Sequence, residues 1–330
     1  MRAVVHADQL GLAGLKLVDN YPDPQPQANE VVVKLKYAGL NHHDLFVING
    51  NHTADKPPVV PAADGAGVVE AVGSAVTNWQ PGDEVVVNPL LWGQKLDVPP
   101  VYMGILGYPQ DGTLADKVCV PENQLGKKPA YLSWEEAGVL SLSALTAYRD
   151  VFRKAQVKAG ERVLIPGVGG AVATYMVLFA KSCGAHVIVT SRSQEKLDQA
   201  KQLGADEFLL DSDDWLAETP AVDVVIDDVG PATFNRSLAQ LRFEGRLVTF
   251  GSSTGDELTL NLRDLFFNQL QVIGSTGGSQ EEFAKMLELV EAHQWHPVVD
   301  TVYPLADVAA GYQKMMDAKQ SGNIAVKVED

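Results

Sequence analysis

Cysteine is scarce in this chain, with only Cys119 and Cys183 among 330 residues. The two lie in different predicted elements and have no paired spacing, which excludes a disulfide framework and a cysteine-rich zinc lobe. We expect both to be small buried hydrophobic side chains rather than nucleophiles. Reduced thiols of this kind indicate a cytoplasmic protein.

Long apolar runs and basic clusters are also missing. No stretch is long enough to span a bilayer, and the N-terminal MRAVVHADQLGLAG lacks the apolar core and cleavage pattern of a signal peptide. Asp and Glu (42) outnumber Lys and Arg (26), which gives a formal net charge of −16. We therefore expect neither a nucleic-acid partner nor a membrane partner.

The most informative stretch is ERVLIPGVGGAV at residues 161–172. A short apolar run is followed by glycines and then by a helical pattern that reaches Cys183, with a second strand at 186–190. Strand, glycine turn and helix indicate a nucleotide-binding unit, because the helix N-terminus offers N–H groups to a pyrophosphate. The predicted contacts are Gly167, Gly169, Gly170, Ala171 and Val172. Val172 replaces the third fingerprint glycine, and the alternative is a turn that binds nothing.

The rest of the chain divides into two kinds of pattern. Residues 1 to about 125 show short strands between turn signals, typical of a barrel or sandwich, and 129–152 is helical with a capping box at Ser133 and Glu136. From Arg162, six strands alternate with helices, which predicts an α/β doubly wound parallel sheet. A last strand at 324–328 has no such partner, and we expect it to return to the first sheet.

Several motifs resemble the medium-chain dehydrogenase/reductase superfamily over nearly the whole chain. They are YAGLNHHDL (37–45), DGAGVVEAVG (64–73), PGDEVVV (81–87), DGTLADKVCVP (111–121), LSLSALTAYRDV (140–151), the glycine turn and SGNIAVKV (321–328). The resemblance implies a GroES-like β-rich catalytic domain at 1–127 and 277–330 and a Rossmann NADP-binding domain at 128–276. It also implies an active site in the cleft between them and a homodimer.

The catalytic zinc ligands of alcohol dehydrogenases in this superfamily are replaced here. By resemblance, Asn41 stands where those enzymes place a cysteine, and Ala63 stands in place of the histidine of a Gly-His-Glu motif. Leu142 falls on the third ligand position. Because zinc needs thiolate, imidazole or carboxylate ligands, we expect no metal. The chain is most similar to the zinc-free, quinone oxidoreductase-like branch, including proteins labelled zinc-type alcohol dehydrogenase-like.

The predicted cofactor is NADPH. After the second strand of the Rossmann pattern, Ser191 and Arg192 follow Thr190 where NAD-specific sites place an acid, and Lys196 lies one turn on. Hydroxyl and cationic groups suit a 2′-phosphate. The alternative is a polar loop in which Ser193 caps a helix. The resemblance adds Thr146, and strand ends add the remaining nicotinamide contacts: Phe250, Gly251, Ser252, Ser275 and Thr276.

Candidate catalytic residues follow the first long strand. The Asn41 amide is suited to donate to a substrate carbonyl in place of zinc, with helix capping as the alternative. His42 and His43 are candidate proton donors, although for each alone a hydrogen-bonded loop histidine is the favoured interpretation, and Asp44 is expected to bond within the loop. Trp92, Tyr102 and Tyr108 are suited either to wall an apolar pocket or to pack in a core or dimer surface.

Three functions remain open. The leading hypothesis is a zinc-independent, NADPH-dependent oxidoreductase that transfers hydride to a small carbonyl or quinone substrate: a quinone, an enone or an aldehyde. An enoyl-thioester reductase is the second, although the N-terminal domain lacks a Lys/Arg cluster for the phosphates of such a substrate. The third is a non-catalytic NADPH-binding protein.

Overall fold

A computed structural model describes residues 1–50, 58–90 and 104–329. The chain divides into two compact units, one formed by Met1–Leu145 with Gly278–Asp330 and the other by Thr146–Gly277. The sequence predicted domain boundaries after residues 127 and 276. The first compact unit instead extends to Leu145, because α2 (Trp134–Gly138) packs on its strands. Within the described ranges, no helix has both the length and the apolar character needed to cross a membrane.

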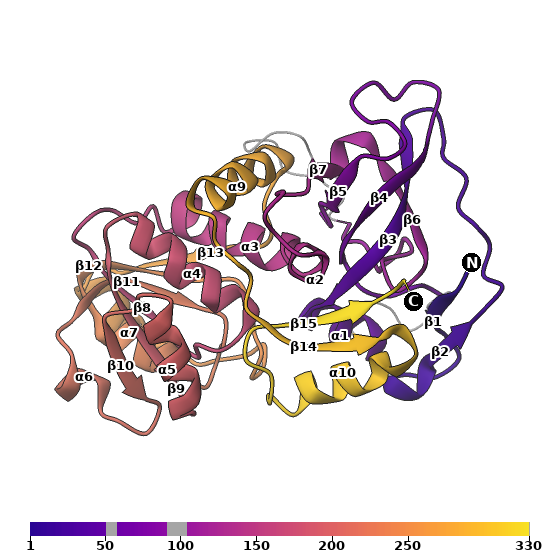
Figure 1. The fold of residues 1–330 in the computed structure, drawn as a ribbon. Helices are drawn as coiled ribbons and strands as arrows, with labels where there is room; N and C mark the ends of the chain where they lie inside the picture. Colours follow the sequence, from indigo (N-terminus) through magenta and orange to yellow (C-terminus); the bar gives the residue numbers. More distant parts are fainter. Residues whose placement is uncertain (51–57, 91–103, 330) are drawn as a thin grey trace. The chain divides into compact units, whose positions relative to one another are not determined.

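The first unit contains a seven-stranded sheet (Figure 1). Its strand order is β14-β15-β3-β4-β5-β7, with β6 also pairing with β3. The bounds are β3 (Glu30–Leu40), β4 (Asp64–Val72), β5 (Glu84–Val87), β6 (Lys117–Pro121), β7 (Leu125–Lys127), β14 (Val299–Pro304) and β15 (Asn323–Lys327). A separate antiparallel pair joins β1 (Ala3–His6) to β2 (Leu15–Val18). The last strand, β15, lies antiparallel to β3, which confirms its predicted return to the first sheet.

Strand β3 shows why this sheet forms. Val31, Val33 and Leu35 alternate along one face and are at most 1% exposed. They join one hydrophobic core with side chains of β5 and β6, among them Val85 and Val120. Burial of each such side chain contributes about 1.5–3 kcal/mol.

The predicted helix at 129–152 is three segments: α2, α3 (Ser141–Tyr148) and a π-helical turn, η3 (Arg149–Lys154). The Ser133–Glu136 capping box at the start of α2 is confirmed. Helix α2 ends at Gly138, where the absence of a side chain leaves room for β3, because a Cβ added there would lie 2.6 Å from Tyr37 Cβ.

Further helices of the first unit are α1 (His42–Ile48), α9 (Gln280–His293) and α10 (Val308–Met316). Helix α10 packs beside β14 (Figure 1). Single 3-10 turns lie at η1 (Leu12–Gly14), η2 (Glu122–Gln124) and η4 (Leu305–Asp307). The presence of α1 corrects the predicted loop at His42 to Asp44, which is the first turn of a helix.

The second unit is built on a parallel sheet of order β10-β9-β8-β11-β12-β13. Its strands are β8 (Arg162–Ile165), β9 (His186–Ser191), β10 (Glu207–Leu210), β11 (Val222–Asp227), β12 (Leu241–Thr249) and β13 (Gln271–Gly274). Its helices are α4 (Ala171–Ser182), α5 (Gln194–Gln202), α6 (Trp215–Glu218), α7 (Phe234–Gln240) and α8 (Leu262–Phe267). This is the Rossmann strand order, so the predicted doubly wound sheet is confirmed.

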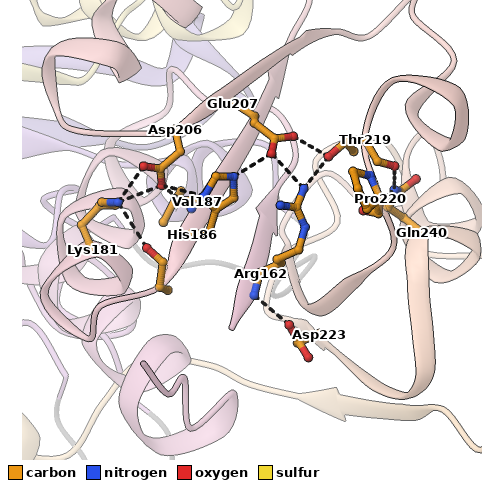
Figure 2. Close-up of polar contacts among 11 residues, drawn as sticks. Arg162, Lys181, His186, Val187, Asp206, Glu207, Thr219, Pro220, Asp223 and Gln240 are labelled. Atoms are coloured by element: carbon orange, nitrogen blue, oxygen red, sulfur yellow. Dashed lines mark hydrogen bonds and ion pairs between the residues drawn. The ribbon is translucent and has the colours of Figure 1, made fainter. Parts of the chain in front are cut away.

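Hydrogen bonds and ion pairs connect side chains at the starts of neighbouring strands in this sheet (Figure 2). Arg162 at the start of β8 donates to Glu207 at the start of β10 over 2.9 Å, and the ring of His186 on β9 contacts the same carboxylate oxygen at 2.6 Å. Hydrogen bonds from Thr219, His186 and Arg162 lower the pKa of Glu207, although burial acts in the opposite direction. The opposite edge, where the strands end, remains for a ligand.

Candidate functional site

The glycine turn has the backbone that a pyrophosphate site requires. Gly167 and Gly169 adopt positive φ angles of 70° and 126°, which side-chain-bearing residues rarely adopt. Gly170 is the N-cap of α4, with Ala171 and Val172 in its first turn. A Cβ at Gly170 would meet no atom within 4 Å, so open space lies beside this helix N-terminus. N–H groups at such an end suit a phosphate.

Lys196 lies across this turn. A Cβ at Gly169 would lie 2.3 Å from Lys196 Cδ, so the absence of a side chain at Gly169 makes room for the lysine stem. The structure therefore brings the glycine turn and Lys196 together, as a phosphate site requires.

The end of β9 holds the predicted 2′-phosphate residues. Ser191 is buried and Arg192 is exposed, while Ser193 is the N-cap of α5 without a side-chain capping bond. The sequence analysis missed Asp211 beside them. Its carboxylate accepts from Thr190 Oγ1 at 2.8 Å and its backbone N–H donates to the Ser191 carbonyl at 2.9 Å. An acid thus stands at this edge, supplied by the residue after β10 rather than by the end of β9.

The predicted nicotinamide contacts lie after β12 and β13. The Ser275 backbone N–H donates to the Thr249 carbonyl at 2.8 Å, which joins the two strand ends. A Cβ at Gly251 would lie 2.9 Å from the Asp228 carbonyl oxygen, so the chain after β12 packs on the chain after β11. Ser252 donates to Asp256 at 2.6 Å. Phe250 is half-buried and Thr276 is exposed. Thr146 is buried on α3.

Two acids near this edge were not predicted. Asp150 on η3 is fully buried, and within the described part of the chain neither carboxylate oxygen has a hydrogen-bond partner. Burial raises its pKa well above the ordinary value, and the charge of Asp228 acts in the same direction. Burial, together with the charge of Asp227, also raises the pKa of Asp228 to about 7. Nothing in the spacing of these acids signals their burial.

The candidate catalytic residues lie in the first unit, around the start of α1. Asn41 is its N-cap, and the Asn41 backbone N–H donates to Asp44 Oδ2 at 2.8 Å. Tyr312 of α10 donates to the same oxygen at 3.2 Å. Burial raises the pKa of Asp44 to about 8, and the charge of Asp64 adds to that rise. Asp44 therefore bonds within the helix cap as well as to α10.

The Asn41 side chain takes part in a capping box with Asp44 at the start of α1, and it also contacts β4. Its Nδ2 donates to Asp64 Oδ2 at 3.0 Å, and Asp64 Oδ1 accepts the Leu142 backbone N–H at 2.7 Å. Asp64 is 1% exposed, and burial raises its pKa to about 7. Hydrogen bonds thus link Asn41, Asp64 and Leu142, in or next to the three positions that the resemblance assigned to metal ligands.

The residues at this point do not fit a zinc site. They offer one carboxamide and two carboxyls that already hold hydrogen bonds, while Ala63 offers no ligand atom. Among the described residues, no group of three or more His, Cys, Asp or Glu side chains is placed to hold a metal. Zinc prefers thiolate and imidazole in a tetrahedral cage. The predicted absence of a metal remains a prediction.

The other candidates are less constrained. His42 is exposed and His43 is half-buried. Tyr108 is half-buried, whereas Trp92 and Tyr102 lie outside the described residues. Both cysteines are half-buried rather than fully buried, and burial raises the pKa of each thiol, to about 12 for Cys119. Neither thiol is poised as a nucleophile.

Comparison with known proteins assigns both units to described families. Residues 27–130 match the alcohol dehydrogenase GroES-like domain, and residues 171–292 match the zinc-binding dehydrogenase family. A zinc-type alcohol dehydrogenase-like protein of Schizosaccharomyces pombe is 34% identical over 100% of this chain and 99% of its own. A crystal structure of an NAD-dependent alcohol dehydrogenase is 37% identical with a TM-score of 0.95, and the match covers 100% of both chains.

Two further relatives carry different names. The acryloyl-coenzyme A reductase of Sulfurisphaera tokodaii is 28% identical over 95% of this chain and 96% of its own. The quinone oxidoreductase of Homo sapiens is 27% identical over 96% and 94%. Glycine turn, strand order and full-length relatives agree, and the chain belongs to the medium-chain dehydrogenase/reductase superfamily of oxidoreductases.

Proposed function

We propose that the protein is a zinc-independent, NADPH-dependent reductase that transfers hydride to a quinone, an enone or an aldehyde. The observation that supports this most is the Asn41 carboxamide, which Asp64 holds at the position of the replaced metal ligands. An amide cannot act as a Lewis acid, but it donates a hydrogen bond to an oxygen on which negative charge develops.

The residues divide the work between the two units. Bound NADPH supplies the hydride from nicotinamide C4. The glycine turn and Lys196 bind its phosphates, and the strand ends at Gly251 and Ser275 orient the nicotinamide. Asn41 polarises the acceptor carbonyl, and a proton from water, His42 or His43 completes the reduction.

The preference for NADPH is assigned to Arg192 and Lys196. A charge-assisted bond to phosphate is worth about 1.5–3 kcal/mol, so Arg192→Ala should raise the NADPH dissociation constant about tenfold and barely change that of NADH. Lys201→Ala is the matched control, since it removes an equal charge from the same unit but in the last turn of α5, at the opposite end of that helix from Arg192. Equal weakening of both cofactors by Arg192→Ala, or NADH preference in the wild type with Asp211 as its determinant, would refute the assignment.

Turnover of Asn41→Ala tests the function itself. We expect about a tenfold loss in kcat for an enone or aldehyde, smaller for a quinone because a quinone is already electrophilic, and little change in NADPH affinity. Wild-type rates on all acceptors would show that Asn41 takes no part.

An enoyl-thioester reductase is the second candidate, favoured by the resemblance to an acryloyl-coenzyme A reductase. The acceptors tested in the turnover assay should therefore include acryloyl-coenzyme A and a simple enone of the same reactivity. A kcat/KM at least a hundredfold higher for the thioester would favour this candidate. Tight NADPH binding without oxidation by any acceptor would instead indicate a binding protein.

A further inference from the structure

The Asp64 carboxylate has two oxygens with different freedom. Oδ1 accepts the backbone N–H of Leu142 at 2.7 Å, and a backbone N–H can only donate. Oδ2 faces the Asn41 side chain at 3.0 Å. The protonation state of Asp64 therefore changes only what Oδ2 presents to Asn41.

Asn41 responds because its amide has a donor side and an acceptor side. Half a turn about the last side-chain bond exchanges Nδ2 and Oδ1. While Oδ2 is ionised it holds Nδ2, because Oδ1 in that place would set two acceptors against each other. At this depth, where Asn41 is 9% and Asp64 1% exposed, such an unpaired arrangement is costly.

We propose that Asp64 is a positioning residue for the reduction: it sets the direction in which Asn41 presents its second N–H to the acceptor oxygen. The inference rests on the proposed role of Asn41. When a proton binds Oδ2, the new O–H donates to Asn41 Oδ1, so that the amide inverts, gives up its capping contact with the Asp44 backbone and points its N–H groups elsewhere. Ionised Asp64 is thus the form that supports hydride transfer.

Other titratable groups belong to the same neighbourhood. Asp44 and Asp64 both accept hydrogen bonds from Asn41, and Tyr312 donates a hydrogen bond to Asp44. Further titratable groups lie on elements that adjoin β4 or Asn41: His42 and His43 on α1, Glu30, Lys34, Lys36 and Tyr37 on β3, Glu84 on β5, Glu135 and Glu136 on α2, and Tyr148 on α3. A pH profile must therefore be read against a variant that lacks only the Asn41 amide.

Asp64→Asn makes the inverted state permanent. The new Oδ1 accepts from Leu142, its Nδ2 faces Asn41, and Asn41 must turn its oxygen inward. We expect kcat for an enone to fall about tenfold, as in Asn41→Ala, with unchanged NADPH affinity and no further loss in the double variant. Asp116→Asn is the matched control, because it removes a carboxylate of the same unit that bonds Arg2 instead. It should leave kcat unchanged.

The wild-type pH profile tests the same idea without a folding risk at Asp64. Since burial raises the pKa of Asp64 to about 7, kcat should fall as pH decreases through that region, and Asn41→Ala should lack this step. Suppose that Asn41→Ala lowers kcat but Asp64→Asn does not, or that the two losses in kcat multiply in the double variant. The proposed role of Asp64 is then wrong, while the proposed function stands. If Asn41→Ala reduces an enone at the wild-type rate, the proposed role of Asn41 fails first.

Discussion

At the residue scale, two buried aspartates of the second unit have opposite surroundings. The Asp227 carboxylate accepts from the backbone N–H groups of Val229 and Gly230 and from the hydroxyls of Thr233 and Ser237, at 2.7–3.2 Å. The Asp150 oxygens have no such donors among the described residues. Burial therefore favours the neutral form of Asp150, whose pKa is raised well above its ordinary value.

Because their surroundings differ, replacement of these two aspartates by Leu should have opposite effects on the free energy of unfolding. Leu has the heavy-atom shape of Asp, so Asp150→Leu should leave the free energy of unfolding unchanged or raise it at pH 8. Asp227→Leu should lower it by several kcal/mol, because it strands buried donors worth about 1–3 kcal/mol each. Urea denaturation measures both. Similar losses for the two variants would contradict this account.

The pH dependence of Asp150→Leu follows from the sign of the shift. The folded protein keeps a proton that the unfolded chain releases above the ordinary carboxyl value of 3.8. Wild-type stability at this site therefore falls as pH rises toward the folded pKa, by about 1.4 kcal/mol per unit of pKa difference. The advantage of Asp150→Leu should be larger at pH 8 than at pH 5; an equal difference at both pH values would mean that Asp150 is ionised in the folded state.

Asn41 was predicted as a catalytic candidate only because of the family resemblance; its residue type alone did not identify it. Asp64, Asp150 and Asp211 were missed as site residues because their roles depend on partners far away in sequence, such as Leu142 for Asp64 and Thr190 for Asp211. A single aspartate in a sequence carries no sign of whether it will be buried, bonded or exposed.

At the element scale, the glycine turn was predictable because it is local. A strand, positive-φ glycines and a helix start follow one another within a dozen residues. The helix at 129–152 was predicted as one piece, whereas it breaks after Gly138, a residue that packs closely against Tyr37, 101 residues before it in the chain. Local patterns give elements, whereas distant contacts decide where helices end.

Two adjacent glycines test whether this turn binds a pyrophosphate. Gly169→Ala should lower the free energy of unfolding by about 1–2 kcal/mol, because φ is 126° and the Cβ displaces Lys196. Gly170→Ala has φ of −78° and open space, so the apo protein should keep its stability. It should nevertheless weaken NADPH binding about tenfold or more, since the Cβ fills the phosphate space. Wild-type affinity in Gly170→Ala, by titration of cofactor fluorescence, would mean that the turn holds no phosphate.

At the scale of the whole molecule, the second unit has an uncovered edge. Among the residues that the structure describes, strand β13 pairs only with β12, and Val272 on it is 41% exposed. On α8, just before it, Phe266 and Phe267 are 62% and 64% exposed with ring centroids 4.8 Å apart. An apolar sheet edge of this kind is a template for pairing with another chain.

We propose that a second copy of this chain covers the edge, with β13 paired to its counterpart about a two-fold axis. Val272→Glu together with Phe267→Glu should convert a dimer into a folded monomer, as measured by sedimentation, because like charges would face each other across the axis. Lys16→Glu with Lys319→Glu is the control, on exposed side chains of the first unit. A monomeric wild type, or a variant that remains dimeric, would contradict the proposed interface.

The central claim is that this family member reduces its acceptor without a metal. The direct measurement is the kcat of NADPH-dependent enone reduction before and after exhaustive chelation, with zinc content determined by elemental analysis in the same samples. We expect less than about a tenth of a zinc ion per chain and an unchanged kcat, because the proposed polarising group is the Asn41 amide, which donates to Asp64. About one zinc per chain, lost together with activity and restored by added zinc, would contradict it.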